Sequence, residues 1–209
     1  MRPMIYFLGG PPRIGKSIIA KAITRQHGIN AVSTDSLGVV LETVLRPEAM
    51  PSLFAVSRFN EMPEAERVRS LVENPSNRID CQIEESTAVW RAVVPFVLRE
   101  QEEGRDLVTE GVAVLPELVA QLEGVDYRAV FLGNRGLTQK EGIKRGALEH
   151  EHDWMRHASA EYIAAFAAFV AQMSSYVEVE ARTYGFDYFE MGGRPFNDAA
   201  PEVVDLLLG

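Results

Sequence analysis

One segment of the chain has the residue types and spacing of a phosphate-binding loop, G-x-x-x-x-G-K-[ST]. In this pattern glycines let backbone N–H groups turn toward a bound anion, the lysine reaches the outer phosphates, and the hydroxyl binds Mg²⁺. An apolar run at 4–8 precedes the motif, and a helical pattern at about 16–27 follows it. We therefore expect ATP and Mg²⁺ here, with Ser17 as the metal ligand and the nucleotide bound by Gly10, Pro11, Pro12, Arg13, Ile14, Gly15, Lys16, Ser17 and Ile18.

Two carboxylates follow other strand-like runs. Asp35 comes just after 31–33, and Glu110 closes 106–110. A carboxylate at such a position can orient an attacking hydroxyl and accept its proton, or hold Mg²⁺ through water. We predict catalytic roles for Lys16, Asp35 and Glu110, with Asp35 also contacting substrate and Gly111 letting substrate approach the backbone. Alternatively, Asp35 caps a helix and Glu110 pairs with a surface cation.

Cations are concentrated after the run 127–132, in a segment of about 134–157 that we interpret as a lid. Phosphoryl transfer needs positive charge on the migrating group, often supplied by a mobile arginine. Arg135 and Arg145 are the catalytic candidates, although each could instead be a solvated surface charge.

Further arginines are candidates for binding the two substrates. Arg194 lies in a glycine-containing turn after 186–191, where an adenine ring could rest, or where the chain simply turns. Arg78 and Arg91 share a predicted helix at about 76–103 and could clamp an acidic acceptor, because the guanidinium group binds carboxylate or phosphate in a bidentate manner.

The elements that must position these residues alternate between strand and helix. The strand-like runs are 4–8, 31–33, 106–110, 127–132 and 186–191. Such alternation predicts a five-stranded parallel sheet with helices on both faces, a three-layer α/β fold whose ligands bind at the carboxyl ends of the strands. We expect one domain over 1–209, with a helical insertion at about 35–104 broken at Pro47, Pro51, Pro63 and Pro75. Trp90 should be a core residue. Further helices are expected at about 155–184 and 199–208.

Composition limits the partners. The 209 residues include 21 Lys and Arg against 30 Asp and Glu, a net charge of −9, which argues against nucleic acid or membrane as a partner. Residues 1–30, in contrast, hold five cations and no carboxylate. A single cysteine, and an apolar run at 163–171 too short to span a bilayer, favour a cytoplasmic protein. The alanine-rich helix at 155–184 could form a homodimer face, but a core helix is the better interpretation.

Together, the loop at 10–17, Ser33-Thr34-Asp35-Ser36, Glu110-Gly111-Val112 and Val130-Phe131-Leu132-Gly133-Asn134 resemble segments of the small P-loop kinases related to nucleoside monophosphate kinases. The 2-phosphoglycerate kinases are the most similar group, and zeta-toxin-like and chloramphenicol phosphotransferase-like kinases are more distant. The resemblance implies a P-loop NTPase fold and an ATP-dependent kinase acting on a small-molecule hydroxyl or phosphate, with 2-phosphoglycerate as a candidate acceptor.

The sequence departs from that group at two positions. Arg13 replaces a small residue of the loop, and Gly38 stands where 2-phosphoglycerate kinases tend to have an arginine. A non-catalytic or regulatory nucleotide-binding protein remains the alternative function. A guanine-specific Asn-Lys-x-Asp motif is not supplied by residues 133–136.

Overall fold

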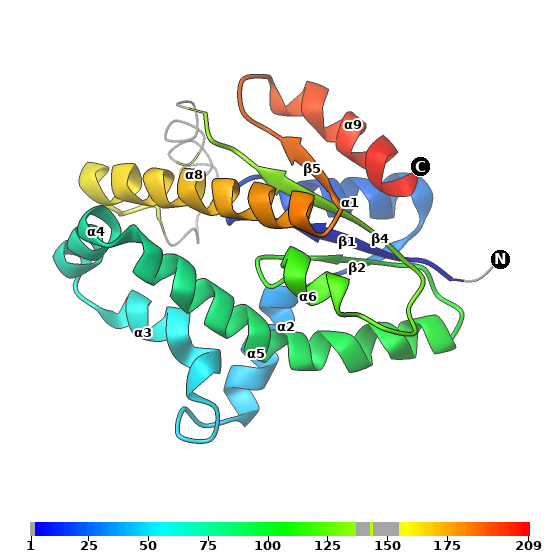
Figure 1. Cartoon of the computed structure of the whole chain (residues 1–209), viewed down its shortest axis with the longest axis horizontal. Helices are drawn as coiled ribbons and strands as arrows, with labels where there is room; N and C mark the ends of the chain where they lie inside the picture. The colour runs from blue at the N-terminus through cyan, green and yellow to red at the C-terminus, as the bar shows by residue number, and fades with distance from the viewer. Residues whose placement is uncertain (1–2, 137–142, 144–154) are drawn as a thin grey trace.

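A five-stranded parallel sheet forms the centre of the structure, a computed structural model that describes residues 3–136, 143 and 155–209 (Figure 1). The strand order is β2-β3-β1-β4-β5, and each neighbouring pair is parallel. The strands are β1 (Ile5–Gly9), β2 (Asn30–Ser33), β3 (Leu107–Glu110), β4 (Tyr127–Gly133) and β5 (Asp187–Glu190). Every predicted strand is confirmed, with bounds that shift by no more than one residue at either end.

Helices cover both faces of this sheet (Figure 1). Helices α1 and α9 contact each other and pack on β1, while α5, α6 and α8 lie on the other side, with α8 against β4. The described helices are α1 (Lys16–His27), α2 (Thr34–Val44), the 3₁₀ turn η1 (Pro51–Phe54), α3 (Ala55–Glu61), α4 (Glu64–Glu73), α5 (Pro75–Glu102), α6 (Pro116–Ala120), α8 (Ala160–Thr183) and α9 (Phe196–Leu208). The predicted three-layer α/β fold is confirmed.

The predicted helical insertion is the run α2 to α5, between β2 and β3. Proline fixes φ and lacks an N–H, so it suits the first turn of a helix. Accordingly, Pro51 begins η1, Pro63 immediately precedes α4, and Pro75 begins α5. Trp90 of α5 is buried, with its ring 5.6 Å from that of Phe7 in β1, which confirms it as a core residue and fixes α5 on the sheet.

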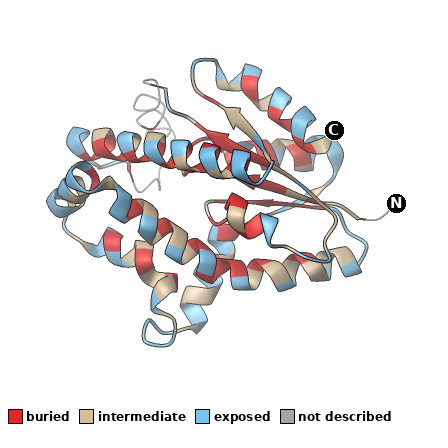
Figure 2. Ribbon diagram, in the orientation of Figure 1, coloured by how far each residue is buried: buried red, intermediate tan, exposed pale blue. Residues whose placement is uncertain are grey.

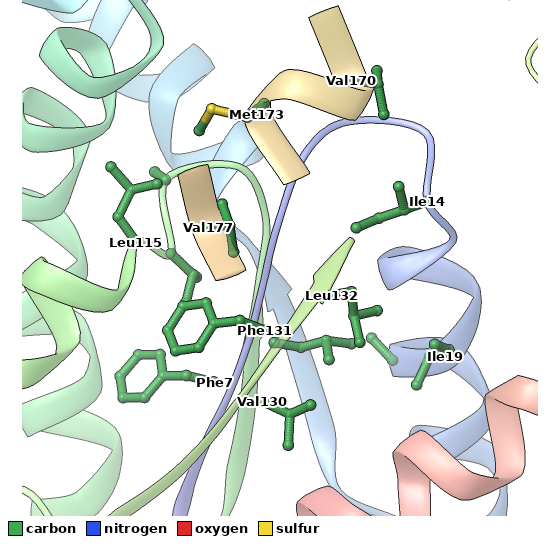
Figure 3. Close-up of a cluster of buried hydrophobic side chains, with 14 of the residues drawn as sticks. Phe7, Ile14, Ile19, Leu115, Val130, Phe131, Leu132, Val170, Met173 and Val177 are labelled. Carbon is green, nitrogen blue, oxygen red and sulfur yellow. The ribbon is translucent and has the colours of Figure 1, made fainter. Parts of the chain in front are cut away.

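Alternating side chains of the strands supply the core on both faces of the sheet, because successive residues of a strand point to opposite sides. In Figure 3, Phe131 lies with Phe7 and Leu115, while Val130 and Leu132 point the other way. Figure 2 shows the buried positions following the strands and the sheet-facing sides of the helices.

Helix α8 is a core helix, as the sequence predicts. It is the one helix of the described residues long and apolar enough to cross a membrane by composition, but 56% of that window is buried within the structure. The helix begins at Ala160 rather than 155, since the Ser159 hydroxyl accepts the Tyr162 N–H at 3.0 Å and caps its first turn.

Two short helices add detail to the prediction. Helix α6 lies between β3 and β4, where the alternation predicts a helix without giving its bounds; Pro116 opens its first turn, and Leu118 and Val119 are buried. Helix α9 begins at Phe196, three residues before the predicted start, directly after Pro195.

Candidate active site

The phosphate-binding motif forms the turn from β1 into α1. Gly10 and Gly15 have φ of 132° and 96°, which glycine adopts at little cost. Gly15 precedes α1 as its N-cap, and no side chain caps the first turn. The N–H groups of that turn therefore point toward the site where an anion would lie, with the positive end of the helix dipole behind them.

Arg13 is the residue of this loop in an unusual conformation, with φ of 67°. Side chains other than glycine pay about 1–2 kcal/mol for this left-handed region. Glycine would adopt this conformation without that cost.

Lys16 is buried beneath the loop. Its ammonium group donates to the carbonyl oxygens of Gly10 at 2.9 Å and Pro11 at 2.7 Å. Burial lowers the pKa of Lys16, and the carboxylates of Asp35 and Glu110 act against that shift. The amine is thus held at the inner edge of the loop, with both predicted carboxylates near enough to influence its charge.

Ser17 and Glu110 meet across the sheet edge. The Ser17 hydroxyl donates to Glu110 Oε1 at 2.9 Å. Burial raises the pKa of Glu110, while Lys16 and the Ser17 hydrogen bond oppose the rise. A hydroxyl and a carboxylate beside a phosphate-binding loop are the oxygen ligands that Mg²⁺ takes in proteins, so these two residues fit that ion.

Asp35 lies at the start of α2 with an exposed side chain directed to a pocket. The helix cap is Ser33, whose Oγ accepts the Asp35 N–H at 3.3 Å, so the alternative that Asp35 itself caps the helix is wrong. Because a neighbour performs the capping, the Asp35 carboxylate remains available to a ligand.

Gly111 has a different role from the predicted one. With φ of 145°, a Cβ at this position would lie 1.8 Å from Thr34 Oγ1. Thr34 is buried, and its hydroxyl accepts the Ala113 N–H at 3.4 Å. The glycine therefore lets the ends of β2 and β3 pack closely, and this contact fixes Asp35 relative to Glu110. Approach of substrate to Gly111 stays a prediction.

A pocket of about 260 Å³ opens beside the loop and extends into the helical insertion. Pro12 forms its wall toward the phosphate loop, Val112 and Ala113 follow β3, and Phe166 comes from α8. The remaining walls come from α2, α3 and α5. The polar side chains that line it are Thr34, Asp35, Glu42, Asn60, Arg78, Gln82, Glu85 and Ser86.

The two arginines predicted to bind substrate are separated by this geometry. Arg78 lines the pocket and is buried, whereas Arg91 is exposed and lies outside it. Three further lining residues, Glu42, Gln82 and Glu85, were not predicted. Glu85 was detectable, since it follows Arg78 by seven residues and so returns to the same side of the helix.

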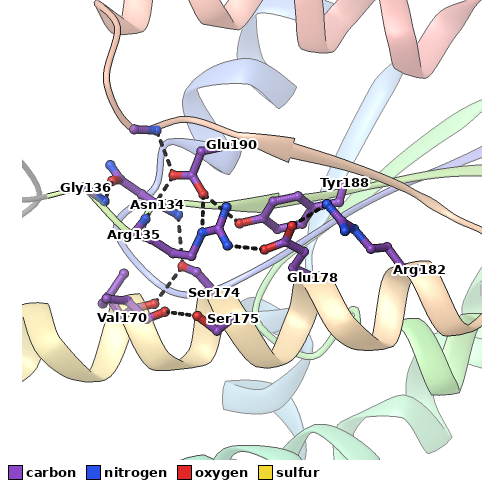
Figure 4. Close-up of polar contacts among 12 residues, drawn as sticks. Asn134, Arg135, Gly136, Val170, Ser174, Ser175, Glu178, Arg182, Tyr188 and Glu190 are labelled. Atoms are coloured by element: carbon purple, nitrogen blue, oxygen red, sulfur yellow. Dashed lines mark hydrogen bonds and ion pairs between the residues drawn. The ribbon is translucent and has the colours of Figure 1, made fainter.

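The predicted lid cations fall in two groups. Arg145 lies outside the described residues. Arg135 forms ion pairs with Glu178 and with Glu190, the latter at 2.9 Å, and its guanidinium lies 5.9 Å from the Tyr188 ring (Figure 4). Both ion pairs of Arg135 are with carboxylates of the protein. For Arg135 to contact a phosphate group instead, these ion pairs would have to break. Its catalytic role stays a prediction.

Glu190 joins the elements around Arg135. It accepts hydrogen bonds from the backbone N–H groups of Arg135 and Gly192 and from the Tyr188 hydroxyl. Burial alone would raise the pKa of Glu190, but these hydrogen bonds and that of the Arg135 side chain together lower it. The carboxylate thus ties the ends of β4 and β5 together in its charged form.

Arg194 lies beyond β5, over the Phe189 ring at 4.9 Å, and pairs with Glu202 at 2.8 Å. Nearby, the Phe196 ring packs directly on Gly15 of the phosphate loop. A Cβ at Gly15 would lie 2.3 Å from this ring, so only glycine leaves room for the contact. The segment after β5 therefore reaches the loop, as an adenine-side segment must, while direct contact of Arg194 with nucleotide stays a prediction.

Comparisons with known proteins support the fold and the sequence resemblance. No family model matches the chain. The chain is 27% identical over 185 residues to a 2-phosphoglycerate kinase of Pyrococcus furiosus, covering 87% of this chain and 57% of that protein. It is 32% identical over 124 residues to a 2-phosphoglycerate kinase of Pyrococcus horikoshii, covering 58% of this chain and 39% of that protein. The chain thus spans about half the length of these curated relatives.

Solved structures agree on the architecture. A sugar kinase of a Janibacter species matches with a TM-score of 0.57 and 11% identity, covering 99% of this chain and 95% of that one. Shikimate kinase of Acinetobacter baumannii matches with a TM-score of 0.52 and 13% identity, covering 99% and 93%. The chain therefore has the three-layer fold of the small P-loop kinases, and its sequence is similar to that of 2-phosphoglycerate kinases over most of its length.

Proposed function

We propose that the chain is an ATP-dependent kinase that transfers the γ-phosphate to a hydroxyl group of a small molecule. One observation carries the proposal: the pocket of the insertion adjoins the phosphate loop, with Asp35 at their junction. A nucleotide bound by the loop and an acceptor bound in the pocket would therefore meet beside a carboxylate.

Each residue then has a defined part in the transfer. The phosphate loop and Lys16 hold the phosphates, and the lysine neutralises charge that develops on them. Asp35 orients the acceptor hydroxyl and accepts its proton as a bond forms between that oxygen and the γ-phosphorus. The bond from the γ-phosphorus to the bridging oxygen of ADP breaks in the same displacement.

Ser17 and Glu110 would hold Mg²⁺, which when bound neutralises phosphate oxygens. This assignment rests on their hydroxyl and carboxylate oxygens lying 2.9 Å apart beside the loop. We also propose that ATP is the phosphate donor and that the protein acts in the cytoplasm. The names of the curated relatives make 2-phosphoglycerate one candidate acceptor.

The test is ADP release from ATP with and without added acceptors. Lys16→Ala should lower acceptor-dependent release by about 10²- to 10³-fold, because a buried charge on the phosphates is lost. Lys21→Ala, which removes an exposed lysine of the same helix, is the matched control.

Asp35→Asn should lower kcat while the Kd for ATP stays nearly unchanged, since Asp35 serves the acceptor. The alternative, a nucleotide-binding protein without catalysis, predicts ATP binding with no acceptor that raises ADP release above its rate in water. Unchanged turnover in Asp35→Asn would remove this residue from the catalytic group.

A further inference from the structure

The wall of the pocket in the insertion has an unequal set of charges. Among the described residues that line it, Arg78 is the one cation, and three carboxylates face it: Asp35, Glu42 and Glu85. Such a wall attracts one anionic group and repels a ligand that carries several. The charge of the acceptor can therefore be argued from the pocket itself.

Arg78 is the residue of this wall that an anionic ligand would stabilise. It is buried, and none of the described carboxylates lies within ion-pair distance of it. Its guanidinium lies 5.4 Å from the ring of Phe59 and 5.0 Å from that of Phe169, and it donates to Gln82 Oε1 at 3.3 Å. A buried cation without a carboxylate partner is costly for the fold, and a ligand anion would remove that cost.

A chain of hydrogen bonds holds the arginine in place. Gln82, which accepts from Arg78, donates in turn to Ser86 Oγ at 3.4 Å, and Ser86 donates to the Val112 carbonyl at 3.2 Å. The bonds all run in one direction from the guanidinium to the backbone after β3. Arg78 is thus preorganised as a single planar fork, which matches one carboxylate.

Glu42 and Glu85 have the opposite requirement. Glu85 Oε2 accepts the Val56 N–H at 2.9 Å, and Glu42 Oε1 accepts the Ser57 hydroxyl at 3.3 Å. The second oxygen of each accepts no hydrogen bond from another described residue. Hydroxyl groups of a ligand can donate to these oxygens, whereas the carboxylates of Glu42 and Asp35 would repel phosphate oxygens, which are acceptors.

Resting on the proposed kinase function, we propose that the acceptor is a small hydroxy acid without phosphate. Its carboxylate pairs with Arg78, and its hydroxyls donate to Glu42 and Glu85. One hydroxyl remains for Asp35 and receives the γ-phosphate of ATP, losing its proton to that carboxylate. This acceptor class differs from 2-phosphoglycerate, which brings a dianionic phosphate as well as a carboxylate to a wall with one arginine.

The test compares matched acceptors in the ADP-release assay. The three-carbon series is glycerol, glycerate and 2-phosphoglycerate, and the six-carbon series is glucose, gluconate and 6-phosphogluconate. In the series that fits the pocket, we expect kcat/KM for the unphosphorylated acid to exceed that of the neutral and the phosphorylated member by about tenfold or more.

The outcomes separate the two proposals. Preference for the phosphorylated or the neutral member overturns the hydroxy-acid assignment and leaves the kinase function standing. Absence of ADP release with all six compounds counts against the kinase function, and the hydroxy-acid assignment falls with it.

A second measurement adds a cation to the wall. Gly38 of α2 lines the pocket in helical backbone, and a Cβ there would meet only Val89 Cγ2, at an ordinary 3.5 Å. Gly38→Arg should shift the kcat/KM ratio toward the phosphorylated acid by about tenfold or more. Ser36→Arg, an equal charge change at an exposed position of α2 outside the pocket, should leave that ratio unchanged. Equal ratios in the two variants would contradict the assignment.

Discussion

Two arginines illustrate how differently this molecule uses positive charge. Arg135, at the end of β4, is about half exposed and has two carboxylate partners, Glu178 and Glu190. Arg78, on α5, is buried and has no carboxylate partner among the described residues, only two phenyl rings and one amide oxygen. The exposed arginine has carboxylate partners, although water already solvates its charge. The buried arginine is not solvated and has no carboxylate partner among the described residues.

Under the proposed function, this difference separates a structural charge from a ligand-binding one. Burial lowers the pKa of Arg78, with Glu85 acting against that shift, yet a guanidinium stays protonated in proteins. Contacts with aromatic rings return only about 0.5–2 kcal/mol of the cost of burial. We infer that an anionic ligand offsets the remaining cost at Arg78. The ion pairs of Arg135, in contrast, connect the ends of β4 and β5 with α8.

Replacing Arg78 is the largest expected change. Arg78→Met keeps the length and apolar contacts but removes the charge, so kcat/KM for the acceptor should fall by about 10²-fold or more. The free energy of unfolding should be unchanged or higher, since a buried charge is removed. Acceptor titrations and urea denaturation of the same variant measure both effects. A large loss of stability with normal acceptor kinetics would show that Arg78 has a structural role and does not bind the acceptor.

Replacing Arg135 should have the complementary effect. Arg135→Met leaves Glu178 and Glu190 without one partner, and we expect unfolding free energy to drop by about 1–3 kcal/mol. The acceptor KM should stay as in the parent chain. Arg182→Met is the control, because Arg182 pairs with Glu178 from a side chain that is 72% exposed, and the loss should be below about 0.5 kcal/mol. If Arg135→Met instead lowered kcat about 100-fold at unchanged stability, Arg135 would be the transfer cation that the sequence predicts.

A smaller effect is the pH dependence of the free energy of unfolding that arises from Glu85, which lines the same pocket as Arg78. Burial raises the pKa of Glu85 to about 7, against the Val56 N–H and Arg78, which lower it. The folded chain therefore holds this proton more tightly than the unfolded chain, so stability should fall as pH rises from about 4.5 through 7. Glu85→Gln should remove about 1–2 kcal/mol of that fall, less than the full shift implies because the pocket is open to water.

Urea denaturation at pH 5 and pH 8 measures this difference. Glu84→Gln, at the exposed neighbouring position on α5, should leave the pH dependence as it is. Identical pH profiles for Glu85→Gln and the parent chain would show that Glu85 is charged and well solvated, and would weaken the contrast between the two regions.

The phosphate loop and the strand-end carboxylates were predictable because both follow from local pattern and sheet geometry. Asp35 and Glu110 had to approach the loop, since parallel strands bring their carboxyl ends to one edge. Helix geometry separates the two arginines that were predicted to bind substrate together. Arg78 and Arg91 lie thirteen residues apart, which at roughly 100° per residue places them on nearly opposite sides of one helix. They could not both face one pocket.

Other features depend on contacts that could not be predicted from local sequence patterns. The ion pairs of Arg135 join residues from β4, β5 and α8, and no local pattern links a cation to partners more than forty positions away. The role of Gly111 depends likewise on Thr34, which lies 77 positions earlier, on the other side of the whole insertion. Packing between distant segments, rather than propensity, decides such cases.

The adjacency of β2 and β3 has a consequence for how such a protein can change. The two strands are parallel, so the chain leaves β2 after Ser33 at the carboxyl edge of the sheet and enters β3 at Leu107, beside Asn30 at the opposite edge. The whole helical insertion is therefore one crossover connection between adjacent strands, and the loop that would bind the nucleotide follows another strand, β1. Exchanging residues between Ser36 and Arg105 for those of a kinase with this fold would graft a new acceptor preference onto an unaltered donor half. Under the proposed function, the same arrangement would let the acceptor change during evolution while the residues that bind the phosphate donor stay the same.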